Sequence, residues 1–211
     1  MKKAFIVVAV LCFALAANAY STKPKPFEGC PPEGRGKITA THPHGELSKP
    51  KQDLNLLKNR DTPPDVIDHS VTLARILTPS EDKSFKNLMG AEIVGYVAHV
   101  KRGEAKETCN CSRKDIADIH IEVVLNEADK DISSKYMIVE ISPRFQAELG
   151  NLASVKSALQ GHWVKFTGWM MNDVVHRTNA KNTNPHGKNI WRATSWEIHP
   201  VTAFKVVTAP G

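Results

Sequence analysis

The order of the predicted secondary-structure elements is the feature that most constrains the fold of this chain. Alternating apolar and polar residues predict β-strands over residues 91–100, 116–125, 135–142, 162–171 and 190–198. Between the third and fourth strands, apolar residues recur at helical spacing and predict a helix over residues 144–160. Gly161 follows at the position expected for a helix C-terminus. The chain is therefore predicted to be mainly β, with one helix after its third strand.

This element order is that of the OB-fold, a five-stranded Greek-key barrel with its helix between strands 3 and 4. We therefore expect an OB-fold-like domain over residues 66–208, with a mixed sheet carrying one helix as the alternative. Residues 66–77 are expected to add an extra strand or a short helix, and residues 201–207 to continue the last strand beyond Pro200.

The first 19 residues have the pattern of a signal peptide. Lysines at positions 2 and 3 precede an almost wholly apolar stretch, and Ala17-Asn18-Ala19 is an A-x-A cleavage signal. We expect cleavage after Ala19 and an exported protein, periplasmic or secreted; a lipoprotein acylated at Cys12 is the alternative. No later stretch approaches the ~20 apolar residues of a transmembrane helix.

Residues 20–65 are expected to form a flexible, proline-rich arm that precedes the domain. This segment holds eight of the 13 prolines and few large apolar side chains that could offset the entropy of ordering it. Within it, residues 53–60 are predicted to form a turn of helix that docks on the domain.

Three cysteines remain after removal of the signal peptide: Cys30, Cys109 and Cys111. An oxidising compartment favours disulfides, but an odd number leaves at least one thiol free, bound to metal or paired with another chain. Cys109 and Cys111 are an awkward pair, because extended residues two apart lie ~7 Å from each other. Cys30 can reach either of the others, so a disulfide, metal ligation and free thiols all stay open.

Positive charge gathers in the two loops that flank the ligand-binding face of an OB barrel. Residues 101–114 contain five basic and two acidic side chains, and residues 172–192 contain four basic and one acidic, which gives each a formal charge of +3. This distribution predicts an anionic polymer as ligand, either nucleic acid or polysaccharide, although solvated loops often carry such charges without one. The ligand-binding residues expected in these loops and after the third strand are Lys101, Arg102, Arg113, Lys114, Arg144, His176, Arg177, Lys188 and Arg192.

Carboxylates and histidines on the predicted strands suggest a second kind of site. Asp118 shares one strand face with His120, Glu197 shares another with His199, and Glu140 lies on a strand between them. Such a set can bind a divalent metal as cofactor, supply a general acid and base, or form structural ion pairs. The candidate metal ligands are Cys109, Cys111, Asp118, His120, Glu140, Glu197 and His199.

An ordered series of motifs resembles a family of uncharacterised bacterial proteins. The series comprises Cys109-Asn110-Cys111, Asp118-x-His120, Pro143-Arg144, Gly168-Trp169 and Trp196-Glu197-Ile198-His199-Pro200. The resemblance covers about residues 53–205 and implies a shared OB-like domain, but it brings no known activity. Glu122 falls where the family pattern is apolar, which leaves Cys109, Cys111, Asp118 and His120 as the core of any shared site.

These features favour a binding protein over an enzyme. No G-x-S-x-G, P-loop or H-E-x-x-H motif is present, so no common catalytic motif supports an enzyme. We expect an exported OB-fold-like protein that binds an anionic ligand. A metal-dependent hydrolase or nuclease and a structural or interaction protein of the cell envelope are the alternatives, and the sequence does not indicate an oligomeric state.

Overall fold

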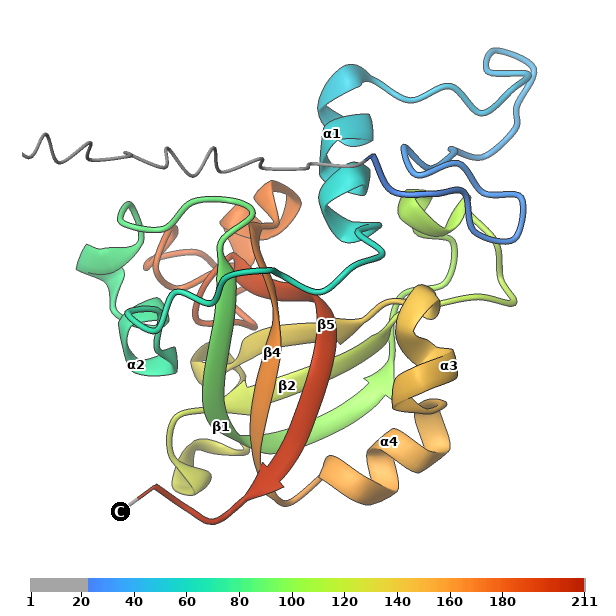
Figure 1. Ribbon diagram of the computed structural model, residues 1–211. Helices are drawn as coiled ribbons and strands as arrows, with labels where there is room; N and C mark the ends of the chain where they lie inside the picture. The colour runs from blue at the N-terminus through green and yellow to red at the C-terminus, as the bar shows by residue number, and fades with distance from the viewer. Residues whose placement is uncertain (1–22, 211) are drawn as a thin grey trace, which may run out of the picture.

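Five strands form a closed barrel in the computed structural model, which describes residues 23–210 (Figure 1). The predicted signal peptide lies outside these residues. The strands are β1 (Gly90–Arg102), β2 (Ile119–Val124), β3 (Met137–Ile141), β4 (Trp163–Asn172) and β5 (Trp196–Val207). They pair in the order β1-β2-β3-β5-β4 around the barrel, and only the pairing of β3 with β5 is parallel. The OB-fold-like barrel predicted from the element order is confirmed.

Alternate residues of each strand fill the barrel interior. On β2, Ile119 and Ile121 are buried in the main apolar cluster, and on β5 Ile198 belongs to the same cluster. Because successive strand residues point to opposite faces, the intervening His120 and His199 lie on the outer face of the sheet. The same alternation that builds the core thus sets out a row of polar side chains on the outside of β2, β3 and β5.

The helical region between β3 and β4 is interrupted, although the sequence predicts one helix over residues 144–160. The structure has α3 (Gln146–Leu149) and α4 (Leu152–Leu159), preceded by a single 3-10 turn. Gly150, with φ of +108°, ends α3, and the Asn151 side chain then accepts a hydrogen bond from the Ser154 N–H to begin α4. Gly161 has φ of +83° just beyond α4, as expected for a residue after a helix end.

The last strand differs from the prediction at its start. Residues 190–195, expected to open the fifth strand, belong instead to the long loop between β4 and β5 (the β4–β5 loop, residues 173–195). Their alternation resembles a strand, but their backbone hydrogen bonds go elsewhere: Arg192 O accepts from Lys181 N, and Ala193 N donates to Tyr136 O. The expected continuation beyond Pro200 is present, since β5 runs to Val207.

Within residues 23–65, expected as a flexible arm, the structure has α1 (Lys49–Lys58), which sits over one end of the barrel (Figure 1). A disulfide between Cys30 and Cys111 links this N-terminal segment to the loop between β1 and β2 (the β1–β2 loop, residues 103–118). The Asn59 side chain, just after α1, donates a 2.9 Å hydrogen bond to Cys109 O in the same loop. Next in the chain, α2 (Leu73–Ile76) is the short helix among the two alternatives predicted for residues 66–77, and it packs into the core.

Within residues 23–210, the structure contains no helix of the length and apolar character needed to cross a membrane.

Candidate functional site

Three neighbouring strands bring two histidines to one carboxylate on the outer face of the barrel. His120 of β2 is the register partner of Glu140 on β3, and the parallel pairing of β5 with β3 places His199 on the other side of Glu140. Nδ1 of His120 lies 2.8 Å from Glu140 Oε1, and Nδ1 of His199 lies 2.9 Å from Glu140 Oε2. The buried Glu140 carboxylate is therefore held between two imidazoles.

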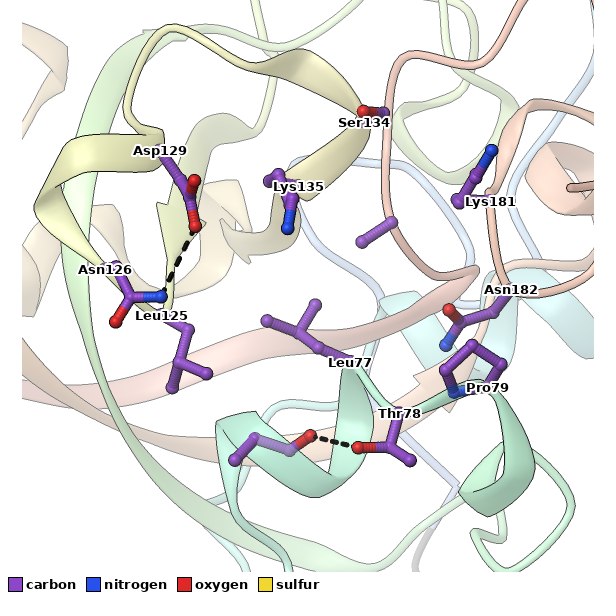
Figure 2. A pocket seen from close by; sticks show the side chains of 12 residues that line it. Leu77, Thr78, Pro79, Leu125, Asn126, Asp129, Ser134, Lys135, Lys181 and Asn182 are labelled. Carbon is purple, nitrogen blue, oxygen red and sulfur yellow. Dashed lines mark hydrogen bonds between the residues drawn. The ribbon is translucent and has the colours of Figure 1, made fainter.

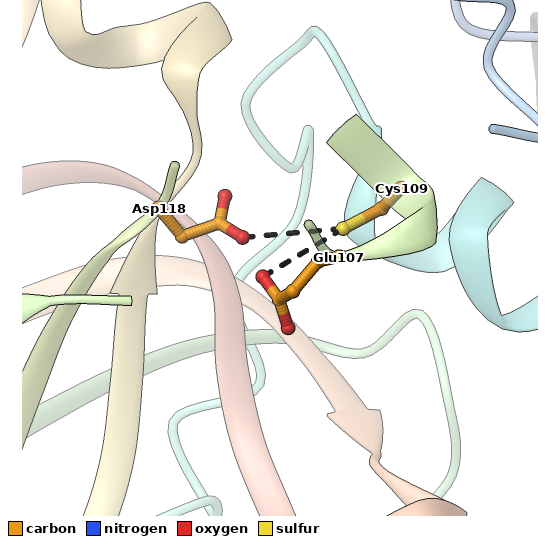
Figure 3. Close-up of side chains that lie close together, drawn as sticks. All are labelled: Glu107, Cys109 and Asp118. Atoms are coloured by element: carbon orange, nitrogen blue, oxygen red, sulfur yellow. Dashed lines mark hydrogen bonds between the residues drawn. The ribbon is translucent and has the colours of Figure 1, made fainter. Parts of the chain in front are cut away.

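Asp118, directly before β2, connects this row to the β1–β2 loop. Its Oδ1 lies 3.8 Å from His199 Nε2, while its Oδ2 accepts a 3.1 Å hydrogen bond from the Asn110 side chain. Oδ2 is also 4.0 Å from the Cys109 sulfur, which lies 3.9 Å from Glu107 Oε2 (Figure 3). The Asp118 side chain, 1% exposed, thus faces an imidazole with one oxygen and a thiol with the other.

Two buried cations lie among these acidic groups. Arg192 is fully buried, and its Nη1 lies 2.8 Å from Glu197 Oε1. Lys58, at the end of α1, places its Nζ 2.9 Å from Asp173 Oδ2 and 3.5 Å from Glu107 Oε1. The N-terminal segment therefore contributes a charge to a site that is otherwise built from the barrel and its loops.

Glu122 continues the network along β2. Its carboxylate pairs with Lys101 and lies 3.0 Å from His99 Nδ1, both on β1, and 3.7 Å from His120 Nε2. The resemblance gave no support to Glu122, but the structure places it in contact with a predicted site residue. We call the connected set the polar cluster: Lys58, Lys101, Glu107, Cys109, Asp118, His120, Glu122, Glu140, Asp173, Arg192, Glu197 and His199.

Proton affinities in the polar cluster are shifted by burial and by the neighbouring charges. Burial disfavours a charged His199, but the Glu140 carboxylate prevails and raises the pKa of His199 to about 10. The pKa of His120 rises to about 9, because the attraction of the Glu122 and Glu140 carboxylates outweighs its burial. Burial raises the pKa of Glu107 to about 9, opposed by Lys58. Both imidazoles and one carboxyl group thus hold protons near neutral pH.

These protons compensate an excess of negative charge. The polar cluster has six carboxylates and three lysine or arginine side chains, which leaves a formal charge of −3 before any of these groups takes up a proton. Buried charges are costly unless they are paired, so the cluster needs bound protons or a bound cation. Bound protons or a bound cation would each offset the excess negative charge of the polar cluster.

Several buried atoms of the polar cluster have no hydrogen-bond partner among residues 23–210. They include both ring nitrogens of His199, Nε2 of His120 and Oε2 of Glu197. The Nδ1 atom of His199 is close to Glu140 but lacks the alignment of a hydrogen bond. A pocket of about 40 Å³ touches His120, Glu140 and Glu197, which is room for one water-sized ligand.

Two groups of side chains in the polar cluster are compact enough to hold a cation. In the first, Asp118, Glu140 and His199 each offer one ligand atom, and these atoms all lie within 4.8 Å of one another. Glu107, Cys109 and Asp118 form the second group by the same measure. Asp118 belongs to both.

The predicted metal ligands separate into two sets. Asp118, His120, Glu140, Glu197, His199 and Cys109 all join the polar cluster. Cys111 does not, because its sulfur is bonded to Cys30 and is not available as a thiolate ligand, which corrects that expectation. Cys109 is the free cysteine of residues 23–210, and it is buried.

Three of the predicted anion-binding residues make contacts within the protein: Arg113, Arg144 and Arg192. Arg113 pairs with Asp115 and Glu28, and Arg144 donates to Lys25 O in the N-terminal segment. Arg192 is buried with Glu197, so it does not contribute to an exposed basic surface. The remaining residues are exposed or partly exposed, and among them Arg102 donates a 2.6 Å hydrogen bond to Lys114 O. They are Lys101, Arg102, Lys114, His176, Arg177 and Lys188.

Besides Glu122, which the resemblance discounted, sequence reasoning missed three members of the polar cluster: Lys58, Glu107 and Asp173. Lys58 lies in a helix that also exposes lysines, and the two acidic residues were counted as loop charges. The sequence did hold one signal: Asn55, Lys58 and Asn59, at the end of α1 and directly after it, have the spacing of three and four residues that places side chains on one helical face. The structure buries all three.

A second pocket, of about 380 Å³, lies away from the polar cluster (Figure 2). Leu77 and Leu125 provide apolar walls, while Lys135 and Lys181 stand at its rim. Its lining includes no member of the polar cluster and no predicted site residue.

No family model matches the chain, and a search of curated proteins also finds no match. Its function is therefore inferred from the geometry of the polar cluster.

Proposed function

We propose that this protein binds a divalent cation of the zinc class through Asp118, Glu140 and His199. One observation carries the proposal: three ligand atoms from different strands and a strand end lie within 4.8 Å of one another, around an imidazole whose two buried nitrogens face carboxylates without making an aligned hydrogen bond. Buried polar atoms normally make hydrogen bonds, and a bound cation would complete this arrangement.

The donor set suits zinc or a similar ion. Imidazole nitrogen and carboxylate oxygen bind Zn²⁺ at about 2.0–2.2 Å, and small shifts of these side chains would bring the three atoms to such distances. A bound cation would also replace the protons that otherwise compensate the carboxylates, because ligating histidine must be neutral. Three protein ligands leave a fourth position open, which is the pattern of catalytic zinc sites.

The position on the fold supports a binding role. The polar cluster lies on the outer face of β2 and β3, between the β1–β2 and β4–β5 loops, where OB barrels bind their ligands. The pocket of about 40 Å³ reaches Glu140 and shares Lys58 and Glu107 with a wider groove of about 290 Å³. The groove is a route by which an ion could approach.

Export to an oxidising compartment is part of the proposal. The A-x-A pattern at Ala17-Asn18-Ala19 supports it, and so does the Cys30–Cys111 disulfide, since such bonds persist mainly outside the cytosol. Fractionation of cells that produce the full chain, with mass analysis of the mature N-terminus, tests this part. Recovery of the uncleaved chain in the cytosol would contradict it.

Metal analysis tests the cation site. Untagged protein, stripped with chelator and dialysed against zinc, should retain zinc, and calorimetry should show saturable binding. Glu140→Gln and His199→Gln should each abolish or greatly weaken binding at this site. Glu122→Gln is the matched control, because it changes a buried carboxylate on the same face that is outside the group, and it should bind as the wild type does. Wild-type protein without metal above background, and without heat of binding, would refute the proposal.

An anionic ligand is the second candidate, supported by the formal charge of +3 on each of the two loop segments that flank the OB binding face. The wider groove between these loops is lined by Lys51, Lys58 and Lys106, together with Glu104, Glu107 and Asp173. Oligonucleotide or polysaccharide binding should weaken steeply with salt and fall in Lys51→Ala/Lys106→Ala, but not in Lys83→Ala, an exposed lysine outside the groove. Absence of binding at low salt would exclude it. The same zinc-loaded samples, followed for oligonucleotide cleavage, test the hydrolase alternative.

A further inference from the structure

We propose that Glu107, Cys109 and Asp118 form a second cation site, which shares Asp118 with the first and so makes a two-ion centre. This inference rests on the cation site proposed above and adds a thiolate ligand to it. Figure 3 shows one oxygen of each carboxylate facing the Cys109 sulfur, both from the same side.

The separations are close to those around a bound zinc ion. With a Zn–S bond of about 2.3 Å and a Zn–O bond of about 2.1 Å, tetrahedral geometry sets sulfur and oxygen about 3.6 Å apart. The Cys109 sulfur lies 3.9 Å from Glu107 Oε2 and 4.0 Å from Asp118 Oδ2. Contraction of a few tenths of an ångström would therefore suffice.

The surroundings of Cys109 are unusual for a structural cysteine. Buried free thiols ordinarily behave as small apolar side chains, but this one faces two carboxylates and lies near the Lys58 ammonium. A single S–H can donate to only one acceptor, so one of these two carboxylates gains nothing from the thiol. A cation would bind both carboxylates and the sulfur together.

The two oxygens of Asp118 point to the two sites. Oδ1 lies 3.8 Å from His199 Nε2, and Oδ2 lies 4.0 Å from the Cys109 sulfur. A carboxylate that bridges two ions in this way holds them about 3.5–4 Å apart in two-metal enzymes. Asp118 is accordingly the bridging ligand of the proposed centre.

An independent observation links the sites through open space. The pocket of about 40 Å³ is lined by Glu107 of the second site and Glu140 of the first, and by Glu197, whose Oε2 is buried and unpartnered. Cys109 and Glu107 also line the wider groove of about 290 Å³. A water-sized ligand therefore has room between the ligands of the two sites, and the second site has a route to the surface.

The thiolate sets the chemical class of the second ion. Sulfur ligands select zinc, cobalt or cadmium over magnesium and calcium. Lys58 Nζ approaches Glu107 through Oε1, at 3.5 Å, which leaves Oε2 for the ion. Its closer partner is Asp173, so Lys58 keeps a counter-charge when the ion binds.

Zinc stoichiometry of the mature chain, with its disulfide intact, provides the main test. We expect two zinc ions per wild-type chain, one for Cys109→Ser and for Glu107→Gln, and none for Asp118→Asn. Glu148→Gln is the matched control, an exposed carboxylate on α3 that lies outside both groups and lines neither the pocket nor the groove, and it should keep two.

Cobalt substitution supplies a readout that does not depend on a variant folding. Wild-type protein should show thiolate-to-cobalt charge-transfer absorption, which only Cys109 can provide in the mature chain because Cys30 and Cys111 are bonded to each other. One zinc per wild-type chain without that absorption would overturn the second site and leave the first intact. No zinc at all would overturn both, so the two failures are distinguishable.

Discussion

Lys58 and Asp173 form a buried ion pair, with Nζ 2.9 Å from Oδ2, that joins the N-terminal segment to the β4–β5 loop. The two residues are far apart in sequence, and neither belongs to a barrel strand. The ion pair therefore holds the end of α1 against the β4–β5 loop, a contact that does not involve the barrel strands.

Lys58→Met should lower the free energy of unfolding by about 3–5 kcal/mol, because it leaves the Asp173 carboxylate buried without its cation. Urea unfolding measures the change. Lys51→Met, at an exposed position of the same helix, is the control and should change stability by less than about 0.5 kcal/mol. The double variant Lys58→Met/Asp173→Leu should lose less free energy of unfolding than Lys58→Met alone, because no unpaired carboxylate stays buried. A single variant as stable as the wild type would contradict the assigned role.

Cys30→Ser/Cys111→Ser should lower stability by about 2–5 kcal/mol, since the bond closes a loop of 81 residues in sequence. Reduction of the wild type should shift its denaturation midpoint to that of the variant. The variant itself should not respond to the reductant, which serves as the control. Limited proteolysis after reduction should cut first within residues 23–48, before α1.

Glu122→Gln should flatten the loss of stability on acidification. Burial opposes ionisation of Glu122, but the neighbouring His120 imidazolium and Lys101 ammonium prevail and lower its pKa from 4.5 to about 2. A depressed pKa contributes stability that is fully present above about pH 4.5 and is lost as the pH falls towards about 2. The contribution is at most about 3.5 kcal/mol, at about 1.4 kcal/mol per pKa unit, and solvent screening reduces it.

Urea unfolding of wild type and Glu122→Gln at a series of pH values measures how much the ionised Glu122 contributes to the free energy of unfolding. The variant should be the less stable protein near neutral pH, and the difference should shrink as the pH falls through the window of about 4.5 to 2. A difference that stays constant across this range would show that Glu122 acts through packing alone.

Gly168→Ala should destabilise the barrel by about 3 kcal/mol. A Cβ at Gly168 would lie 2.3 Å from Pro200 O, a backbone atom of β5 that cannot turn aside as a flexible side chain could. The register of β4 against β5 shifts at this glycine, so the two backbones approach closely there. Thermal unfolding measures the effect, and an unchanged midpoint would mean that the strands separate at little cost.

The barrel could be predicted from the sequence because each strand shows its alternation of apolar and polar residues over a short stretch of chain. Alternation along β2, for example, places Ile119 and Ile121 in the core and His120 outside, and each assignment needs only neighbouring residues. Residues 190–195 show the limit of this reasoning. They alternate like a strand, yet Arg192 and Ala193 use their backbone groups to bond with Lys181 and Tyr136 instead.

The candidate site could be predicted in part, because strand residues such as Asp118, His120 and Glu140 reach it by regular alternation. Lys58 could not, since its partners come from loops whose paths depend on the whole fold. The pairing of Cys30 with Cys111 could not be predicted from the sequence either. Cys111 has φ of +55°, just after a 3-10 turn, and this local geometry directs it to Cys30 while Cys109 stays buried and free.

Closure of the barrel by β5 has a consequence for how the chain is made. β5 pairs with both β3 and β4, and it is the last strand in sequence order. During synthesis or transport from the N-terminus, β3 and β4 therefore each keep one edge of unpaired backbone N–H and C=O groups until residues 196–207 have emerged. Exposed strand edges promote association between chains. A stop codon shortly before Trp196 would accordingly yield aggregating chains instead of a smaller working barrel.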